Sequence, residues 1–377
     1  MADLDPSSPG CHVASDGSVT FVLRSADAGS VVVAGDFTGW SKAPIALQRA
    51  AGSDRWVAKT SPLSAGLHAY KYIVDGRWIA DPANPLDIDD EVGGRNSAFV
   101  VGGRTPGGER AVRVLSLNLH TWQEKDAHRK LQHIALGAAV MDVDLLLLQE
   151  VGEHVSDPSR PNAGGILGGY LERFTRRAWH HAWREAHIGF DVYREGVSIL
   201  SSSPLNEVTE HQLSGGHFAR VALVATTTLK GVTLRVGSTH VSWGSEGGAE
   251  VKLLLEKLDR TRVAGPAATL IAGDFNAGPT DPQIRQFVGR GYVDVGTSTG
   301  MIEPTFGERE LRDRIDYHLL RTSAGRSAPR VEGFMRVFDG AAPGFHPRVS
   351  DHAGLLGAYR WPLDEGHRRG GPSSFDG

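Results

Sequence analysis

Short runs in which apolar and polar residues alternate, separated by turn-forming residues, extend from about residue 18 to residue 101. Alternation with a period of two is typical of a strand that buries one face against a core. Strands of this kind at short intervals predict a small, immunoglobulin-like all-β sandwich. The predicted strands cover residues 19–23, 31–34, 56–59, 67–74 and 97–101.

After residue 110 the pattern changes, because longer apolar runs typical of buried strands alternate with helical periodicity. Several of these runs end in polar residues. Since buried strands that end in polar residues bring them to one rim of a layered α/β fold, we expect the functional site on that rim. The runs cover residues 112–118, 143–150, 197–201, 234–240, 269–276 and 315–320, and the helical patterns cover residues 125–141 and 246–262.

The segment 102–110, Gly-Gly-Arg-Thr-Pro-Gly-Gly-Glu-Arg, separates the two patterns. Its glycine, proline and charge cannot build a core, so it is predicted to be a linker. The expected organisation is a flexible N-terminus over residues 1–17, a first domain over 18–101, a second domain over 111–360 and a disordered tail over 361–377.

Composition and charge limit the classes of partner and metal that the chain is expected to bind. The 377 residues include 40 Lys and Arg against 44 Asp and Glu, which is not the positive excess typical of proteins that bind nucleic acids. The single cysteine, Cys11, excludes a disulfide framework and a cysteine-based zinc site, so any metal is expected to be a hard ion.

No apolar stretch reaches the roughly 20 residues of a membrane span, and no apolar signal segment precedes the first domain, so we expect a cytoplasmic protein. Four histidines lack metal-site spacing and are interpreted as surface or core residues: His120, His180, His181 and His187.

Polar residues stand at the ends of six predicted strands of the second domain. Each alone would more often be a turn or cap residue, but Gln149 and Glu150 follow four leucines, where burial of a carboxylate is costly unless it faces a polar pocket. Together they suit attack of water on a phosphate, with carboxylates for a hard cation, a carboxylate that activates the water, and histidine donors. The residues are Asn118, Glu150, His240, Asp274, Asn276, Asp316, Asp351 and His352.

In their order along the chain, these motifs resemble those of the endonuclease/exonuclease/phosphatase superfamily, the DNase I-like enzymes. The resemblance implies a two-sheet β-sandwich flanked by helices, dependence on Mg²⁺ (or Mn²⁺), and hydrolysis of a phosphoester. It spans residues 113–357 and rests on Ser-Leu-Asn118-Leu, Leu-Gln-Glu150-Val, Tyr193-Arg-Glu195-Gly-Val-Ser-Ile-Leu-Ser, Ser-Thr-His240, Gly-Asp274-Phe-Asn276, Arg-Ile-Asp316-Tyr and Ser-Asp351-His352.

The resemblance also implies a role for each matching residue. Glu150 would be the principal metal ligand, with Asn118 and Asp351 close to the cation or to a second one. Asp274 and Asn276 would position the nucleophile and the phosphate. The remaining residues would contact or approach the scissile phosphate: His240 paired with Glu195, His352 paired with Asp316, and Tyr193 and Arg220.

The first domain resembles the glycogen-binding type of carbohydrate module, through Ala-Gly-Asp-Phe-Thr-Gly-Trp at residues 34–40 and Gly-Leu-His-Ala-Tyr-Lys-Tyr-Ile-Val-Asp-Gly-Arg-Trp at residues 66–78. In binding members, two tryptophans stack on glucose while a lysine and an asparagine bond its hydroxyls. The resemblance therefore implies α-glucan as a partner, and the alternative is a module that only packs against the catalytic domain. The matching positions are Trp40, Lys71, Trp78 and Asn96.

The catalytic motifs do not select a substrate. An aromatic-rich stretch over residues 179–191 is similar to the branch that contains maltose 6'-phosphate phosphatases, and with the attached module it favours a phosphorylated sugar, an α-glucoside phosphate. Trp179, Trp183 and Phe190 of this stretch have an alternative role in the core. Two other functions stay open: a Mg²⁺-dependent endonuclease or exonuclease, and a glycan-binding scaffold with an inactive hydrolase domain. The number of metal ions and the oligomeric state also stay open.

Overall fold

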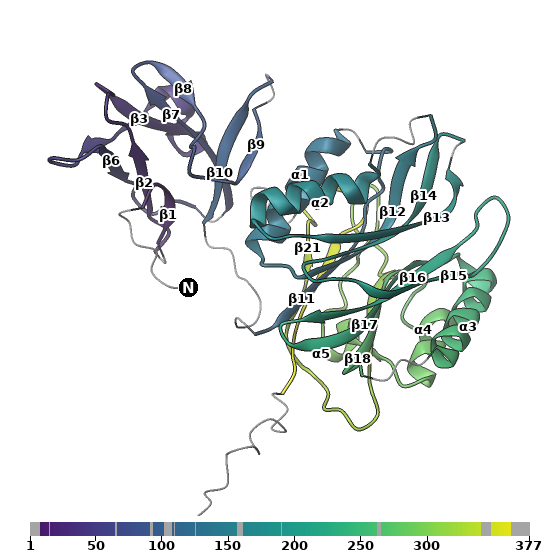
Figure 1. Cartoon of the computed structure of the whole chain (residues 1–377). Helices are drawn as coiled ribbons and strands as arrows, with labels where there is room; N and C mark the ends of the chain where they lie inside the picture. The colour runs from purple at the N-terminus through teal and green to yellow at the C-terminus, as the bar shows by residue number, and fades with distance from the viewer. Residues whose placement is uncertain are drawn as a thin grey trace, which may run out of the picture.

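The computed structural model contains a small all-β domain followed by a larger domain with two facing sheets and helices on both outer faces (Figure 1). It describes residues 8–14, 16–64, 66–90, 93–101, 108, 110–124, 126–156, 161–189, 191–261, 265–340 and 348–362. Within these residues, no helix combines the length and the apolar character needed to cross a lipid bilayer.

The first domain is a β-sandwich, as predicted. Phe21 packs between the sheets against Tyr70, Tyr72 and Phe99, with ring centroids 4.9 to 6.5 Å apart in edge-to-face arrangements. One sheet has the order β1 (Gly10–Val13), β2 (Val19–Arg24), β6 (Arg55–Lys59), β5 (Gln48–Arg49). The other has the order β4 (Ile45–Ala46), β3 (Val31–Gly35), β7 (Gly66–Val74), β10 (Arg95–Val101), β9 (Asp87–Asp89), with β8 (Arg77–Ile79) beside β7. Two short 3₁₀ helices, η1 (Asp36–Thr38) and η2 (Trp40–Lys42), follow β3.

The N-terminus differs from the flexible segment predicted over residues 1–17. Gly10–Val13 form β1, which pairs antiparallel with β2. Cys11 and Val13 pack against the apolar core of the first domain, and this burial stabilises the strand. The sequence of the four residues alone does not indicate that contact. The prediction is therefore wrong for this stretch, while residues 1–7 lie outside the described part of the chain.

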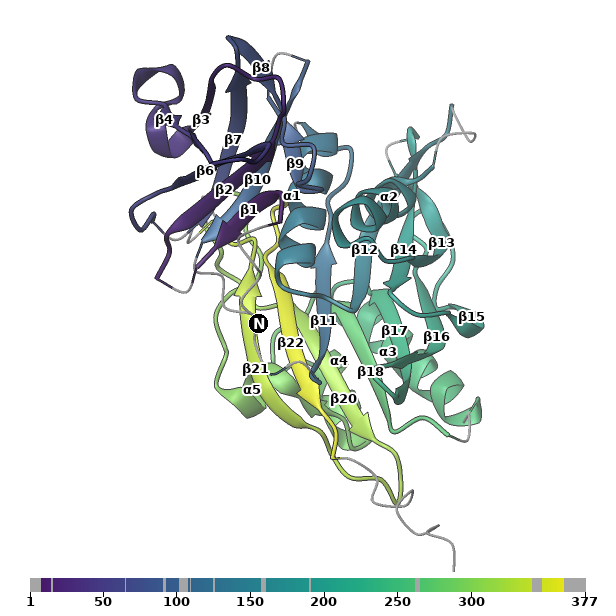
Figure 2. The same cartoon turned by 60° about the vertical axis from the view of Figure 1, so that its left-hand side comes forward.

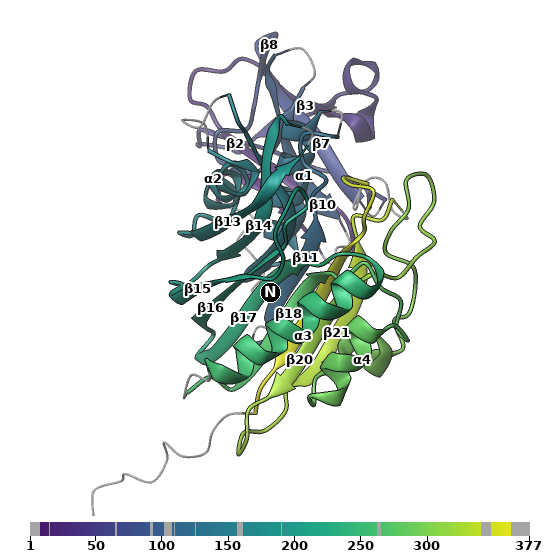
Figure 3. The same ribbon diagram turned by 90° about the vertical axis from the view of Figure 1, so that its right-hand side faces the viewer.

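The second domain is a two-sheet β-sandwich flanked by helices, which confirms the predicted fold (Figures 2 and 3). One sheet has the order β13 (His180–Gly189), β14 (Tyr193–Ser201), β12 (Leu145–His154), β11 (Val112–Asn118), β22 (Gly354–Arg360), β21 (Arg330–Val337). The other has the order β15 (Asn206–Gln212), β16 (Val221–Leu229), β17 (Val232–His240), β18 (Ala268–Asp274), β20 (Asp316–Thr322), β19 (Val293–Asp294). The helices are α1 (Ala127–Val140) and α2 (Ala163–Thr175) on the first sheet, and α3 (Gly244–Arg260), α4 (Pro282–Gly289) and the short α5 (Val295–Thr299) with the second.

The central strands bury both faces, which explains why their apolar runs lack alternation. In β12, Leu145 and Leu147 belong to the core between the two sheets. Leu146 and Leu148 belong instead to the core between the first sheet and helices α1 and α2. Because successive strand residues point to opposite faces, four consecutive leucines supply two cores, and a charged residue is expected only where the strand reaches the rim.

The first domain packs against α1 and α2 through an apolar contact. Leu86 and Ile88 lie against the same apolar cluster that contains the buried faces of these helices. Arg173 of α2 also donates a hydrogen bond to Asp87 of β9. The predicted linker over residues 102–110 and the predicted tail over residues 361–377 lie mostly outside the described residues, so both stay predictions.

His318 in β20 is expected to make the fold sensitive to acid. Its Nδ1 lies 2.7 Å from the Tyr359 hydroxyl, and burial lowers its pKa to about 3. A histidine in the unfolded chain has a pKa near 6.5, so the neutral, buried His318 makes its full contribution to the free energy of unfolding above that pH. As the pH falls from 6.5 toward 3, this free energy decreases by about 1.4 kcal/mol per pH unit. Thermal melts at several pH values should show a smaller loss of Tm on acidification for His318→Gln than for the exposed-site control His128→Gln. Parallel curves for the two variants would refute this assignment.

Candidate active site

The ends of β11, β17 and β18 and a bulge within β12 meet at one rim of the second domain and bring the predicted residues together. β11 and β12 run parallel, as do β17 and β18, and their registers set Asn118 opposite Gln149 and His240 opposite Asp274. β20 runs antiparallel to β18 and begins at this rim, so Asp316 pairs with Asp274. The rim is thus built from the carboxyl ends of two parallel strand pairs, one in each sheet.

Two residues of the site have left-handed backbone conformations. Glu150 has a φ of 48° and Asn276 a φ of 47°. At Glu150 the pairing of β12 with β14 shifts register between Leu148 and Val151, which marks a β-bulge. Bulges re-aim side chains and recur beside active sites, and a non-glycine residue in this region costs about 1–3 kcal/mol. The fold therefore holds both side chains in place at some cost in stability.

Asn118 links the two central carboxylates. Its Nδ2 donates to Oε1 of Glu150 at 2.9 Å and to Oδ2 of Asp274 at 3.2 Å. Burial raises the pKa of Glu150, and the negative charge of Glu195 adds to the effect. Burial likewise raises the pKa of Asp274, although the positive charge of His352 opposes it. A half-buried acid, Glu150, and a buried acid, Asp274, therefore share one neutral donor.

His240 and Asn276 form a neutral pair beside Asp274. Asn276 Nδ2 donates to the Val241 carbonyl at 2.9 Å and lies 3.0 Å from Nε2 of His240. Burial lowers the pKa of His240, and the positive charges of Arg220 and His352 lower it further. His240 is therefore uncharged, with Nε2 accepting from Asn276 and the proton on Nδ1, which lies 3.9 Å from Oε1 of Glu150.

His352 supplies the positive charge of the cluster. Its Nδ1–H donates to Oδ2 of Asp316 at 2.9 Å, and its Nε2 lies 3.6 Å from Oδ2 of Asp274. Burial lowers the pKa of His352, but the charges of Asp316 and Asp274 outweigh burial and raise the pKa to about 10. His352 is thus an imidazolium at neutral pH, and it lies beside Asp316 as the sequence resemblance implies.

The cluster fits a hard divalent cation. Glu150, His240 and Asp274 each offer a ligand atom, and these atoms lie within 4.8 Å of one another. Carboxylate and amide oxygens are the ligands that Mg²⁺ and Mn²⁺ prefer. A dication bound between the Glu150 and Asp274 carboxylates would offset the negative charge of both. The residues present therefore suit a hard divalent cation bound near Glu150, Asp274 and Asn118.

Asp351 lies beside His120, a histidine interpreted from the sequence as a surface or core residue. Its Oδ1 is 3.6 Å from Nδ1 of His120, and the same nitrogen is 3.0 Å from Oε1 of Glu124. These three residues also offer ligand atoms within 4.8 Å of one another, although Lys130 already pairs with Glu124. His120 stands two positions after Asn118 in the same strand-end motif, and that spacing was the signal that could have identified it.

Glu195 contacts a different histidine from the one the resemblance implies. His187 Nε2 lies 3.5 Å from Oε1 of Glu195, whereas the ring of His240 contacts Asn276, Asp274 and Glu150. The neighbouring strands explain this, because β13 pairs with β14 and sets His187 directly opposite Glu195. Among the described residues the predicted pairing of His240 with Glu195 is therefore replaced by a pair of His187 with Glu195.

Arg220 and Tyr193 stand at the edge of the site. Burial raises the pKa of Glu195 and the positive charge of Arg220 opposes this rise, while burial lowers the pKa of His240 and the charge of Arg220 lowers it further. The Arg220 Nε is buried and has no hydrogen-bond partner among the described residues, as expected of a cation that awaits an anionic ligand. Tyr193 packs edge-on against His154 with ring centroids 5.0 Å apart.

The aromatic stretch before Tyr193 serves mainly the core. Trp179 is buried in the cluster under α2, and its Nε1 donates to the Thr175 hydroxyl at 3.0 Å. Trp183 packs against the same cluster and donates to the Val151 carbonyl at 3.0 Å. The alternative core role of these two tryptophans is therefore the one observed. Phe190 lies outside the described residues.

On the first domain, the four predicted glycan-contacting residues come from β7, from its neighbours β8 and β10, and from the 3₁₀ helix η2. Trp40 and Trp78 have ring centroids 6.3 Å apart, and Trp78 is 46% exposed. Lys71 of β7 is half-buried and pairs with Asp90 at 2.7 Å. Strand β8 sets Trp78 opposite Ile73, on the same side of β7 as Lys71. Asn96 is buried in β10, the strand next to β7.

Two family models match the chain. The model described as the Endonuclease/Exonuclease/phosphatase family matches residues 113–352, and the model described as the Glycogen recognition site of AMP-activated protein kinase matches residues 19–103. Among curated proteins, the chain is 38% identical over 85 residues to a phosphoglucan phosphatase, LSF1, of Arabidopsis thaliana, and 34% identical over 71 residues to the 5'-AMP-activated protein kinase subunit beta-1 of Sus scrofa. These matches cover 22% and 19% of this chain, and they span only 14% and 53% of the relatives' lengths.

Solved structures share the fold of the second domain. An endonuclease/exonuclease/phosphatase family protein from Leptotrichia buccalis matches with a TM-score of 0.56 and 20% identity, over 67% of this chain and all of that one. The catalytic domain of human Nocturnin, with a bound sulfate anion, matches with a TM-score of 0.51 and 20% identity, over 67% of this chain and 95% of that one. At these identities the likeness concerns the fold alone.

Proposed function

The chain belongs to the endonuclease/exonuclease/phosphatase family, and from this premise we propose that it is a divalent-metal-dependent phosphatase that releases phosphate from a phosphorylated α-glucoside. The observation that carries the proposal is the hydrogen-bonded group of Glu150, Asp274 and Asn118 beside the hydrogen-bonded pair of His352 and Asp316. Such a group can bind a hard cation, accept a proton from water and donate to a phosphoryl oxygen within one small volume.

Each side chain has a role in this mechanism. Glu150 and Asn118, with Asp351, would hold Mg²⁺ or Mn²⁺, whose chemistry when bound is to offset negative charge on the phosphoryl oxygens. Asp274, whose Oδ1 accepts a hydrogen bond from the backbone N–H of Asn276, takes the proton of the attacking water. The water oxygen forms a bond to phosphorus as the bond from phosphorus to the sugar oxygen breaks, with no covalent enzyme intermediate. The remaining donors contact the phosphoryl oxygens or the leaving oxygen: His352, His240 and Arg220.

Support for a sugar substrate comes from the first domain rather than from the catalytic rim. The glycogen-recognition model matches that domain, and a protein named as a phosphoglucan phosphatase is 38% identical to this chain over 85 residues. The aromatic stretch adds no support, since Trp179 and Trp183 lie in the core. A module for α-glucan in the same chain would raise the local concentration of a phosphorylated glucan or its fragments.

The deciding experiment is release of inorganic phosphate, with Mg²⁺ or Mn²⁺, from a panel of phosphosugars, nucleotides and inositol phosphates, run beside a plasmid-nicking assay. The proposal expects the highest kcat/KM for an α-glucoside phosphate. Nicking of DNA at enzyme concentrations that release no phosphate from any sugar would instead favour an endonuclease. Absence of turnover in every assay, with the metal bound, would favour a glycan-binding scaffold.

The Trp40 and Trp78 pair gives a separate prediction for the first domain. Trp78→Ala should weaken binding of a soluble α-glucan by at least about tenfold, since exposed tryptophans that stack on a ligand carry a large share of the binding energy. Arg77→Ala, an equally exposed neighbour in β8, is the matched control. Affinity measured by titration calorimetry should be near the wild-type value for the control. Equal affinities for both variants and the wild type would mean that the module is only structural.

A further inference from the structure

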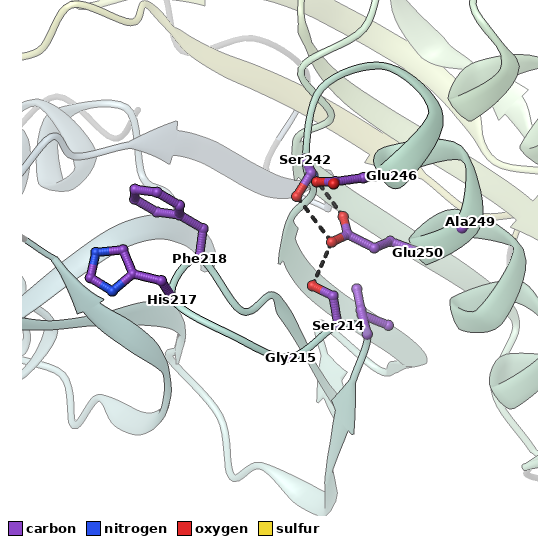
Figure 4. A pocket seen from close by; sticks show the side chains of 9 residues that line it. Ser214, Gly215, His217, Phe218, Ser242, Glu246, Ala249 and Glu250 are labelled. Atoms are coloured by element: carbon purple, nitrogen blue, oxygen red, sulfur yellow. Dashed lines mark hydrogen bonds between the residues drawn. The ribbon is translucent and has the colours of Figure 1, made fainter.

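An open pocket of about 420 Å³ lies beside the catalytic rim, between the loop that joins β15 to β16 and the first turns of α3 (Figure 4). In Figure 4 the ring of Phe218 and the imidazole of His217 stand on one side, and Ser242, Glu246 and Glu250 stand on the other. No sequence motif pointed to this pocket. Its lining residues are Leu213, Ser214, Gly215, His217, Phe218, Ser242, Glu246, Ala249 and Glu250.

The pocket adjoins the catalytic cluster on the side of His240 and Arg220. Ser242 stands two residues after His240, and Arg220 ends the loop that forms the opposite wall. The ring of Phe218 packs edge-on against His187, with centroids 5.7 Å apart, and His187 contacts Glu195. A substrate whose phosphate lies near Arg220 would therefore have its organic part within reach of the pocket.

Glu250 fixes the two walls of the pocket relative to each other. This carboxylate is only 3% exposed, and it accepts hydrogen bonds from the Ser214 hydroxyl at 2.6 Å and from the Ser242 N–H at 2.7 Å. The Arg220 N–H in turn donates to the Ser214 hydroxyl at 3.0 Å. One buried acid thus ties the loop, the segment before α3 and the backbone of Arg220 together, which holds the two walls of the open pocket in place.

The chemistry of the lining indicates which ligand fits. Phe218 is 64% exposed and offers an open aromatic face, whose negative charge attracts the weakly positive C–H groups of a saturated ring. Glu246 and Ser242 can bond hydroxyl groups. No lysine or arginine lines the pocket within the described residues, and two carboxylates do. A second phosphate, as in a nucleic acid backbone, would be repelled there.

We infer that this pocket is the subsite for the leaving group of the substrate, and that it takes a neutral, polyhydroxylated ring stacked on Phe218. The inference rests on the proposed phosphatase function, since it names the part of the substrate that lies beyond the phosphate. Phe218 and Glu246 then act as specificity residues, and Glu250 acts as a positioning residue that holds Arg220 through Ser214.

A binding experiment tests the subsite without relying on turnover. In the full chain carrying Trp40→Ala and Trp78→Ala, which removes the tryptophan pair of the first domain, saturation-transfer NMR with maltose as the probe should detect contact. Addition of Phe218→Ala should reduce the signal by at least about fivefold. Ile302→Ala, which removes an equally exposed apolar side chain outside the pocket, should leave it unchanged. Absence of signal in the parent chain, or equal signals in all three chains, would overturn the subsite.

Turnover separates failure of the subsite from failure of the proposed function. Phe218→Ala should lower kcat/KM for an α-glucoside phosphate by at least about tenfold, and should leave kcat/KM for ethyl phosphate, which has no ring, within about twofold of wild type. Equal losses for both substrates would reject the subsite while the phosphatase function stands. A chain that binds maltose through Phe218 but hydrolyses no phosphate monoester would reject the phosphatase function and keep the subsite. Displacement of maltose by a dinucleotide at lower concentration would overturn the neutral-ring assignment.

Discussion

Replacement of Glu150 by glutamine is expected to reduce phosphate release by on the order of a thousandfold and to abolish detectable binding of Mg²⁺ or Mn²⁺. Glutamine keeps the length of the side chain and an oxygen that can accept from Asn118, but it removes the charge that holds a cation. Loss of metal-assisted charge stabilisation amounts to several kcal/mol in the transition state, and each 1.4 kcal/mol corresponds to a factor of ten. Phosphate release and calorimetric titration with Mn²⁺ measure the two effects.

A matched control lies on the same strand. Glu153→Gln changes a carboxylate of β12 that is paired with Arg194 and lies outside the central cluster, so turnover should stay within about twofold of wild type. Folding of Glu150→Gln should be intact, because burial and the charge of Glu195 both disfavour the ionised Glu150 in the absence of metal. A Tm equal to or above that of the metal-free wild type, with turnover lost, is the expected combination. Turnover preserved in Glu150→Gln would reject Glu150 as the principal ligand.

The strand ends were the part of the site that the sequence could predict. A buried strand has two apolar faces, so a carboxylate two positions after the run Leu145 to Leu148 has few environments other than a polar rim, and Glu150 lies there. The same reasoning places Asp274 at the end of β18 and His240 at the end of β17. These predictions needed only the period of the strands and the cost of burying charge.

Other features depend on contacts between distant segments. The partner of Glu195 is set by the register of β13 against β14, which no local pattern around either residue encodes. The strand β1 forms because Cys11 and Val13 pack against the apolar core of the first domain, although a four-residue segment gives little sequence signal for a strand by itself. Similarly, the pocket beside Phe218 requires Glu250 of α3 to meet Ser214, 36 residues earlier in the chain.

Replacement of Asp274 by asparagine is expected to reduce kcat by roughly a thousandfold while affecting metal affinity less than Glu150→Gln does. Asp274 is the acceptor proposed for the proton of the attacking water, and general-base catalysis typically contributes 10²–10⁴-fold. Asparagine can still accept the backbone N–H of Asn276, which donates to Asp274 at 2.9 Å, so the local geometry should persist. Titration with Mn²⁺ therefore distinguishes the two variants, because Asp274→Asn should lose the proton acceptor and keep most of the metal affinity, whereas Glu150→Gln should lose metal binding.

The pH dependence of Asp274→Asn distinguishes a base from a residue that only shapes the site. Without an acceptor for the proton, the attack depends on hydroxide, so kcat of the variant should rise about tenfold per pH unit above neutrality while kcat of the wild type rises less steeply. Asp316→Asn is the comparison, because Asp316 acts through His352 and leaves Asp274 in place to accept the proton. Its kcat should fall without acquiring the hydroxide dependence. If Asp274→Asn and Asp316→Asn had pH profiles of the same shape, Asp274 would be a positioning residue rather than the base.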